Sequence, residues 1–347
     1  MTSSTAVRQP DDHKLRAATT LGTLVLTRTD VETLLSPDAC RAAVEEAFRA
    51  YGSGDAAPPS VLGVSGAGGG FHIKAGFLRR DRQFFAAKVN GNFSGNATLD
   101  LPRIQGVVIL SDGDTGAPLA VLDSASITTL RTAAATAVAA QYLATHDAAT
   151  VTICGCGVQG RAQLIALTRV RPIRKVFAFD SEQDRAQRFA SKIARELGVD
   201  ATAVDDLRAA TRASAIVVTC TPSRHPFLFA GFLAPGTFVA AVGADSEEKQ
   251  ELDVALLASA TLITDVTAQC AVIGDLHHAI KAGRLSPEHV HAELGEIVAH
   301  EKCGRRSPEE IIVFDSTGMA LQDVAASAAV YERAVATGRG TLVSLSA

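Results

Sequence analysis

A glycine-rich motif directly after a buried-type strand constrains the fold of this chain most. Gly155-Cys156-Gly157-Val158-Gln159-Gly160 follows the apolar run 151–154 and opens a predicted helix. In this setting the first glycine makes the tight turn, the second lets a pyrophosphate approach the backbone, and the third lets the helix pack close to the strand. Free N–H groups at the helix N-terminus favour phosphates. The motif predicts a dinucleotide site contacted by Gly155, Gly157, Val158, Gln159 and Gly160.

An acidic residue, Asp180, ends the next predicted strand, 175–179. A carboxylate at this place hydrogen-bonds the adenosine ribose hydroxyls and repels a 2′-phosphate, so NAD(H) is favoured over NADP(H). Arg185 and Arg188 follow nearby and weaken this preference, so NADP(H) stays an alternative.

The fold class follows from the strands around this motif. Runs of Val, Ile, Ala and Cys predict strands at 151–154, 175–179, 201–204, 215–219, 237–242 and 261–264. Such strands, separated by helices, are typical of a parallel sheet covered on both faces. We therefore predict an α/β protein with a Rossmann doubly wound parallel sheet over residues 143–315.

The flanking segments predict a separate antiparallel α+β module. Strands are expected at 23–26, 71–78, 84–89, 106–111, 118–122 and 341–345. Helices are expected from Thr29-Asp30 to Phe48, from Asp123-Ser124 to Leu143 and over 321–336, and residues 52–70 are expected to form a Gly/Pro/Ala-rich loop. We predict a second domain split between residues 21–142 and 316–347.

Composition excludes several classes of function. Lys plus Arg number 33 against 37 Asp plus Glu, and no basic block would follow a nucleic-acid backbone. No apolar run approaches the roughly 18 residues that span a bilayer, and residues 1–20 lack the apolar core of a signal peptide. We expect a cytoplasmic protein with a disordered extension at 1–20.

A metal site is not expected. The six cysteines form no C-x-x-C pair. The spacing of the histidine-rich segment matches no compact ligand motif, and its candidates are His277, His278, His289, His291 and Glu293.

Three residues outside the glycine motif suit a nicotinamide enzyme for a small acid, which needs a cation for the carboxylate and a group that takes or gives a proton. Arg131 is a lone charge in an apolar predicted helix, and its planar fork can bind a carboxylate bidentately. Lys88 lies at a strand end beside an Asn-rich loop and could exchange protons with an amine. Asp245 follows the predicted strand 237–242 at the carboxyl edge of the sheet, where it could take or give a proton.

Together with the closing segment Phe314-Asp315-Ser316-Thr317-Gly318-Met319-Ala320-Leu321-Gln322-Asp323, these motifs make the chain resemble the ornithine cyclodeaminase/mu-crystallin family. The resemblance implies a homodimer in which a split N-/C-terminal domain for substrate binding and dimerisation flanks a central Rossmann domain. It also implies NAD(P)-dependent chemistry at the α-carbon of amino or imino acids. Lys88 is similar to the family's active-site lysine, Arg131 to its carboxylate-binding arginine and Asp245 to its acid/base aspartate.

The chain departs from the family pattern at two places. The family's arginine upstream of the lysine has no counterpart in 58–63, and we expect Lys74 to replace it. Ser94 and Glu247-Glu248 stand where prolines or Pro-Gly are usual. Further cofactor contacts are expected at Thr132, Thr221, Gly243 and Thr317.

Three functions remain open at this point. The first is an NAD(H)-dependent reductase of a small α-imino acid, either a cyclic ketimine such as Δ1-pyrroline-2-carboxylate or an open-chain imine such as iminosuccinate. The second is an ornithine cyclodeaminase, which forms proline and ammonia and recycles NAD+. The third is a non-catalytic, crystallin-like dinucleotide-binding protein, against which the presence of Lys88, Arg131 and Asp245 argues.

Overall fold

The computed structural model describes residues 22–345, so the predicted extension at 1–20 lies outside the described residues. The chain forms two compact units. The antiparallel unit comprises the described residues up to Ser36, Ser60–Ile127 and the described residues from Asp323 on; the Rossmann unit comprises Pro37–Pro59 and Thr128–Gln322. These units are defined by packing, so the predicted functional boundaries at residues 142 and 315 stay a prediction.

The antiparallel unit is built on one sheet with the strand order β15-β1-β6-β5-β4-β3-β2. Its strands are β1 (Thr23–Leu26), β2 (Ser60–Gly66), β3 (Gly69–Arg79), β4 (Gln83–Phe93), β5 (Ile104–Asp112), β6 (Pro118–Asp123) and β15 (Thr341–Val343). Neighbouring strands are antiparallel except β1 and β6, which are parallel. Along β3, β4 and β5 the buried side chains, among them Lys74, Lys88 and Val108, are even-numbered, as the two-residue period of a strand predicts.

The helices of the first fifty residues differ from the prediction. One helix from Thr29-Asp30 to Phe48 is wrong, because the segment forms α2 (Arg28–Leu34) and α3 (Pro37–Gly52). Proline disfavours helical backbone in the residue before it, so Pro37 separates the two helices. The side chain of Thr27 caps α2, and Asp30 bonds back to the Thr27 backbone.

The expected loop over residues 52–70 is also partly wrong. Residues Ser60–Gly66 form β2, which pairs with β3 from Ser60 opposite Ala75 to Gly66 opposite Gly69. Two residues remain in the turn, and Gly68 adopts a φ of +78°, which glycine tolerates. The main-chain pairing with β3 therefore makes a strand out of a sequence with weak strand propensity.

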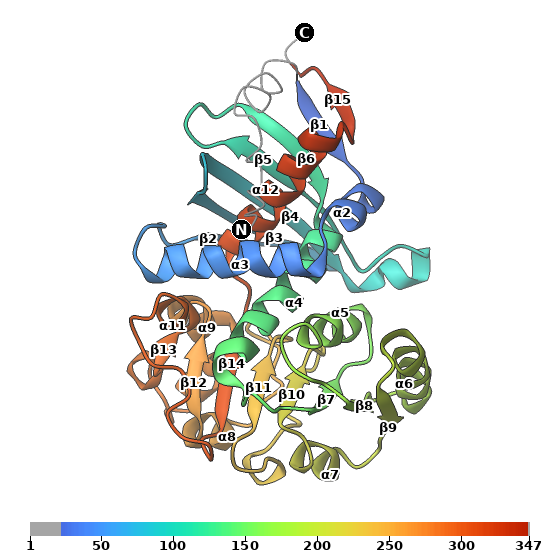
Figure 1. Ribbon diagram of the computed structural model, residues 1–347, viewed down its shortest axis with the longest axis vertical. Coiled ribbons are helices and arrows are strands. Elements are labelled where there is room, and N and C mark those ends of the chain that lie inside the picture. The colour runs from blue at the N-terminus through green and yellow to red at the C-terminus, as the bar shows by residue number, and fades with distance from the viewer. Residues whose placement is uncertain (1–21, 346–347) are drawn as a thin grey trace, which may run out of the picture. The chain divides into compact units, whose positions relative to one another are not determined.

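The Rossmann unit contains a sheet in which every pair of neighbouring strands is parallel, in the order β13-β12-β14-β11-β10-β7-β8-β9. Its strands are β7 (Thr150–Cys154), β8 (Lys175–Phe179), β9 (Asp200–Ala203), β10 (Ile216–Thr219), β11 (Phe238–Ala241), β12 (Thr261–Thr264), β13 (Ala292–Glu293) and β14 (Ile312–Asp315). Figure 1 shows most of them side by side. The predicted doubly wound parallel sheet is confirmed.

Helices complete both units. The Rossmann unit holds α3, α5 (Val158–Leu167), α6 (Gln183–Leu197), α7 (Leu207–Arg212), α8 (Val254–Ser259), α9 (Thr267–Ile273), α10 (Asp275–Lys281) and α11 (Leu294–Val298). Two helices, α4 (Ser124–Leu143) and α12 (Ala320–Thr337), give residues to both units. Short 3-10 helices lie at Ser94–Leu99, Ala230–Phe232 and Pro287–His289. No helix within residues 22–345 is long and apolar enough to cross a membrane.

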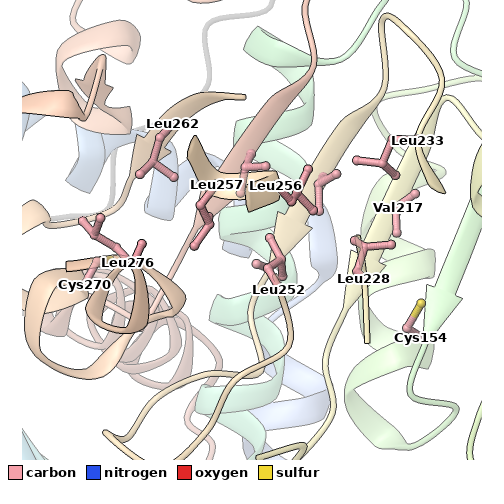
Figure 2. Packing of buried hydrophobic residues seen from close by; sticks show 14 of the residues in the cluster. Cys154, Val217, Leu228, Leu233, Leu252, Leu256, Leu257, Leu262, Cys270 and Leu276 are labelled. Atoms are coloured by element: carbon pink, nitrogen blue, oxygen red, sulfur yellow. The ribbon is translucent and has the colours of Figure 1, made fainter. Parts of the chain in front are cut away.

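A buried apolar cluster fixes one part of the Rossmann sheet to the helices that pack on it. Figure 2 shows its members: Cys154 and Val217 from the strands, Leu252 just before α8, Leu256 and Leu257 in α8, and Cys270 and Leu276 from α9 and α10. Burying one leucine side chain contributes roughly 1.5–3 kcal/mol. This packing holds the strand ends, and the loops that follow them, in fixed positions.

The strand order reverses between β7 and β10. From β7 the chain runs outward through β8 and β9. From β10 it runs in the opposite direction through β11, β12 and β13, and it then returns to place β14 between β11 and β12. In open α/β sheets ligands bind at the carboxyl ends of the strands at such a switch point. We therefore expect a cofactor site at the loops after Cys154 and Thr219.

Candidate active site

The glycine turn after β7 has the form that a pyrophosphate requires. Gly155 adopts a φ of +104°, and a Cβ on it would lie 2.9 Å from the Cys220 carbonyl oxygen. Gly157 is the N-cap of helix α5, and a Cβ on it would meet nothing within 4 Å, so its backbone is open to a ligand. A Cβ on Gly160 would lie 2.2 Å from the Gly155 carbonyl oxygen. Val158 is exposed in the first turn of α5, beside Gln159.

Asp180 ties the end of β8 to this turn. Its carboxylate accepts hydrogen bonds from the Cys156 N–H at 2.9 Å and the Glu182 N–H at 3.0 Å. Arg185 lies 3.3 Å from the same carboxylate and also pairs with Glu182. Arg185 is therefore engaged by two carboxylates, whereas Arg188 is an exposed residue of α6.

Thr221 and Gly243, two of the expected cofactor contacts, share a partner that the sequence did not suggest. Both backbone N–H groups donate to the carboxylate of Glu251, at 2.6 Å from Thr221 and 3.0 Å from Gly243. Burial raises the pKa of Glu251, and the hydrogen bonds from Thr221, Thr219 and Gly243 oppose that rise. Glu251 lies in a run of charged residues, which is a pattern typical of a solvated loop. Nothing in the sequence therefore indicates that its side chain is completely buried.

The turn after β14 is held by a second buried carboxylate. Asp265 accepts hydrogen bonds from the Ser316 hydroxyl at 2.8 Å and from the Gly318 N–H at 2.6 Å. Gln269 donates to the Thr317 hydroxyl at 2.5 Å. Thr317, predicted to contact the cofactor, is therefore a fixed part of a turn rather than of a mobile loop.

Arg131 lies buried in α4 and is 5% exposed. One of its Nη atoms donates to the Gln322 side-chain oxygen at 3.0 Å. Gly318 has a φ of +87°, and a Cβ on it would lie 2.4 Å from Arg131 Nη1, so the guanidinium packs directly on the glycine backbone. The neighbouring Thr132 donates its hydroxyl to Thr128 O, one turn back in its own helix. Arg131 is the only charged residue of α4, so its burial places a cation in a helix that has no acidic residue of its own.

Lys74 and Lys88 are brought together by strand register. They are direct cross-strand partners in β3 and β4, and both are buried on the same face of the sheet. Cβ atoms of directly opposed residues lie about 4.5–5.5 Å apart. Lys88 Nζ lies 2.9 and 2.8 Å from the two carboxylate oxygens of Asp323, which is also buried. The sequence motif ending in Gln322-Asp323 contained this carboxylate, but no role was assigned to it.

Asp245 lies in the turn after β11, at the carboxyl edge of the Rossmann sheet, as its sequence position predicts. Its side chain is 52% exposed and pairs with Lys249. The carbonyl oxygen of Lys249 is in turn bonded by the His278 ring at 2.8 Å. The carboxylate is thus accessible at the edge where a ligand would bind.

The histidine-rich segment has structural contacts of its own. The rings of His277, His289 and His291 lie against Ala271 O, Ser286 and Cys303 O. Among residues 22–345, no three or more His, Cys, Asp or Glu side chains are grouped to hold a metal ion.

The sequence match across the chain decides its relationship to known proteins. A model of the ornithine cyclodeaminase/mu-crystallin family matches residues 22–338. The chain belongs to this family. The resemblance seen in the motifs is thereby confirmed.

Three similar proteins are a dehydrogenase and two reductases. The chain is 39% identical over 321 residues to alanine dehydrogenase of Archaeoglobus fulgidus, covering 92% of this chain and 98% of the relative. It matches Thermococcus litoralis Δ1-pyrroline-2-carboxylate reductase, solved with NADH and L-proline, with a TM-score of 0.88 and 34% identity over 92% of this chain and 100% of that one. It matches iminosuccinate reductase of Paracoccus denitrificans, solved with NAD+, with a TM-score of 0.86 and 32% identity over 93% of this chain and 100% of that one.

The glycine turn gives a first testable consequence. We expect Gly160→Ala to weaken NADH binding at least about tenfold, because overpacking by one methyl group against the Gly155 carbonyl oxygen costs roughly 1–3 kcal/mol or moves the turn. The matched control is Gly231→Ala in the same unit, where a Cβ would meet nothing within 4 Å. Titration of each variant with NADH, followed by fluorescence, measures the effect. Equal Kd values for Gly160→Ala and the unchanged protein would show that the turn does not bind the cofactor.

Proposed function

We propose that this protein is an NAD(H)-dependent oxidoreductase that reduces a small α-imino acid to the amino acid. The observation that carries the proposal is the burial of three cationic side chains, Arg131, Lys74 and Lys88, in a chain that also has a dinucleotide turn. Buried cations need counter-charges, and a substrate carboxylate adds one. The open backbone at Gly157 and the carboxylate of Asp180 suit NAD(H), with NADP(H) as the alternative.

In this proposal each residue has a separate task. When bound, NADH supplies the hydride that the imine carbon receives. Arg131 binds the substrate carboxylate with its planar fork and so fixes the orientation of the imine. Lys88, beside Lys74 and Asp323, adds positive charge and exchanges a proton with the substrate nitrogen. Asp245 is exposed to solvent and relays a proton from water to the substrate nitrogen. The product amine thus gains one proton for the hydride that the carbon receives.

The substrate class is a small imino acid, of which a cyclic ketimine and an open-chain imine are the two forms. The relatives named above include reductases of both forms and an alanine dehydrogenase. The cyclodeaminase reaction is the second candidate, because the same family contains it. It differs by returning the hydride to the product, so that no cofactor is consumed.

We also propose that the protein acts as a homodimer through the outer face of the antiparallel sheet. The odd-numbered residues of β3, β4 and β5 form this face, and several are large, apolar and exposed, among them Phe71, Phe77, Val107 and Ile109. Exposed apolar faces of this extent are typical of protein–protein interfaces. A structure of an archaeal alanine dehydrogenase, 38% identical to this chain, is a dimer with bound NAD.

The proposed activity is tested by following NADH absorbance with a panel of substrates. We expect NADH consumption with Δ1-pyrroline-2-carboxylate, or with pyruvate or oxaloacetate in the presence of ammonia. Ornithine with a catalytic amount of NAD+ is tested in parallel for ammonia release. No NADH or NADPH consumption with any member of the panel would contradict the proposal, and ammonia from ornithine without net cofactor change would replace it with the cyclodeaminase.

A further inference from the structure

We infer that Glu251 is a positioning residue that sets the cofactor-facing loops after β10 and β11 in their binding geometry. The inference rests on the proposed function, because it concerns the same dinucleotide site. Glu251 touches no reacting atom in this account and acts through Thr221 and Gly243.

The contacts of Glu251 join two strand ends through one side chain. Its Oε1 accepts hydrogen bonds from the Thr221 N–H at 2.6 Å and the Thr221 hydroxyl at 2.7 Å. Its Oε2 accepts from the Thr219 hydroxyl at 2.7 Å and the Gly243 N–H at 3.0 Å. One carboxylate thus receives two donors on each oxygen, from the end of β10 and from the loop after β11.

The glycine at position 243 is explained by this carboxylate. A Cβ on Gly243 would lie 2.5 Å from the carboxylate carbon and from both carboxylate oxygens of Glu251. The backbone of the loop after β11 therefore lies so close to the carboxylate that position 243 has no room for a Cβ atom. Gly155 makes a similar approach on the other side of the β10 loop, since its Cβ would meet Cys220 O and the Thr221 methyl group. The Thr221 loop is held between the glycine turn and Glu251.

Further buried carboxylates fix Glu251 itself. Asp275 accepts hydrogen bonds from the Glu251 N–H at 2.8 Å and the Leu252 N–H at 3.0 Å. Asp315, at the end of β14, accepts from the Asp275 N–H at 3.3 Å and the Leu276 N–H at 2.9 Å. Burial raises the pKa of Asp315 to about 7 and that of Asp275 well above its usual value. The position of Glu251 is therefore determined from the sheet edge at β14 as well as from β10 and β11.

The cost of this arrangement argues for a functional reason. Burying three acids next to one another is unfavourable, and apolar residues of similar size pack loops at least as well. Carboxylates, however, can accept several backbone N–H groups at once and so fix loop geometry to within hydrogen-bond tolerance. A ligand that is bound by backbone and hydroxyl groups requires loops positioned with this precision.

The substitution Glu251→Gln tests the inference, because the amide nitrogen must face one of the two backbone N–H groups in either orientation of the side chain. We expect Kd for NADH to rise about tenfold or more, as for the loss of a charged hydrogen bond, and KM for NADH to rise with it. KM for the imino acid should change less than twofold if the substitution acts through the cofactor loops.

The matched control is Glu310→Gln at the opposite, amino edge of the same sheet. Glu310 accepts hydrogen bonds from the Thr261 hydroxyl and the Arg306 N–H and guanidinium, near the starts of β12 and β14. We expect this variant to lower Tm while leaving Kd for NADH unchanged. A Kd for Glu251→Gln equal to that of the unchanged protein, or an equal rise in Kd for Glu310→Gln, would overturn the positioning role.

A second variant keeps the test decisive where Glu251→Gln does not fold. Thr219→Val removes one hydroxyl donor to Glu251 and keeps the shape of a buried side chain. We expect Kd for NADH to rise about threefold, as for a hydrogen bond of modest net value. An unchanged Kd would overturn the inference. If the unchanged protein itself does not bind NADH, the proposed function fails, and this inference fails with it.

Discussion

Replacing Arg131 with methionine is expected to lower kcat/KM for the imino acid about a thousandfold, or roughly 4 kcal/mol, as the loss of a bidentate, charge-assisted contact implies. Arg131 is buried in α4 beside Gln322 and Gly318, where methionine fits as a similar apolar volume. Tm should therefore change little, because an unbranched apolar side chain replaces a buried cation. Kd for NADH should stay within about twofold of the unchanged protein, since the substitution leaves the glycine turn intact.

Arg131→Lys separates charge from geometry. Lysine keeps the positive charge but lacks the planar fork, so we expect it to recover only part of the lost kcat/KM. The measurements are steady-state kinetics at varied imino acid concentration and a fluorescence titration with NADH. Turnover by Arg131→Met at the rate of the unchanged protein would remove Arg131 from the substrate site.

The second large effect is expected at the buried pair of Lys88 and Asp323. Lys88→Met should abolish measurable turnover and lower the free energy of unfolding by about 3–5 kcal/mol, as for a buried ion pair that loses one partner. Asp323, which is 1% exposed, would lose the ammonium group that lies 2.8 Å from its carboxylate. Thermal unfolding and steady-state kinetics measure the two effects on the same preparation.

The double variant Lys88→Met with Asp323→Leu distinguishes stability from catalysis. Replacing both members of a buried pair with apolar residues is often neutral. We therefore expect Tm to return towards that of the unchanged protein while turnover stays abolished. Recovery of turnover together with Tm would show that Lys88 has a structural role and takes no part in the reaction.

Helices and strands could be predicted from the sequence where the local residue pattern favours the same structure that the folded chain adopts. The strand, glycine turn and helix at 151–167 were predicted from the sequence, because backbone geometry requires glycine at positions 155 and 160. The break between α2 and α3 was missed although Pro37 is visible in the sequence, because the apolar periodicity continues across it. Strand β2 was missed because its pairing with β3, rather than the propensity of its residues, stabilises it.

The parts of the site that sequence reasoning missed depend on distant contacts. Lys88 and Asp323 are 235 residues apart in the chain. Glu251 and Thr219 are 32 residues apart, with strand β11 between them, and no local pattern specifies that they meet. The sequence suggests Lys74 by position alone; the register of β3 and β4 sets it opposite Lys88, and its role in the site stays a prediction. Carboxylates buried under loops look like solvated acids in a sequence, and only the fold distinguishes the two.

The most direct test of the proposed reaction is the transfer of deuterium from NADH labelled at C4 of the reduced nicotinamide. The two labelled forms, one for each face of the ring, are incubated separately with the protein and Δ1-pyrroline-2-carboxylate, or with pyruvate or oxaloacetate and ammonia, and the amino acid product is analysed by mass spectrometry. We expect one of the two forms to give a product carrying a single deuterium at Cα, in step with NADH consumption. Unlabelled product from both forms, or proline and ammonia formed from ornithine while NADH stays constant, would contradict the proposed reaction.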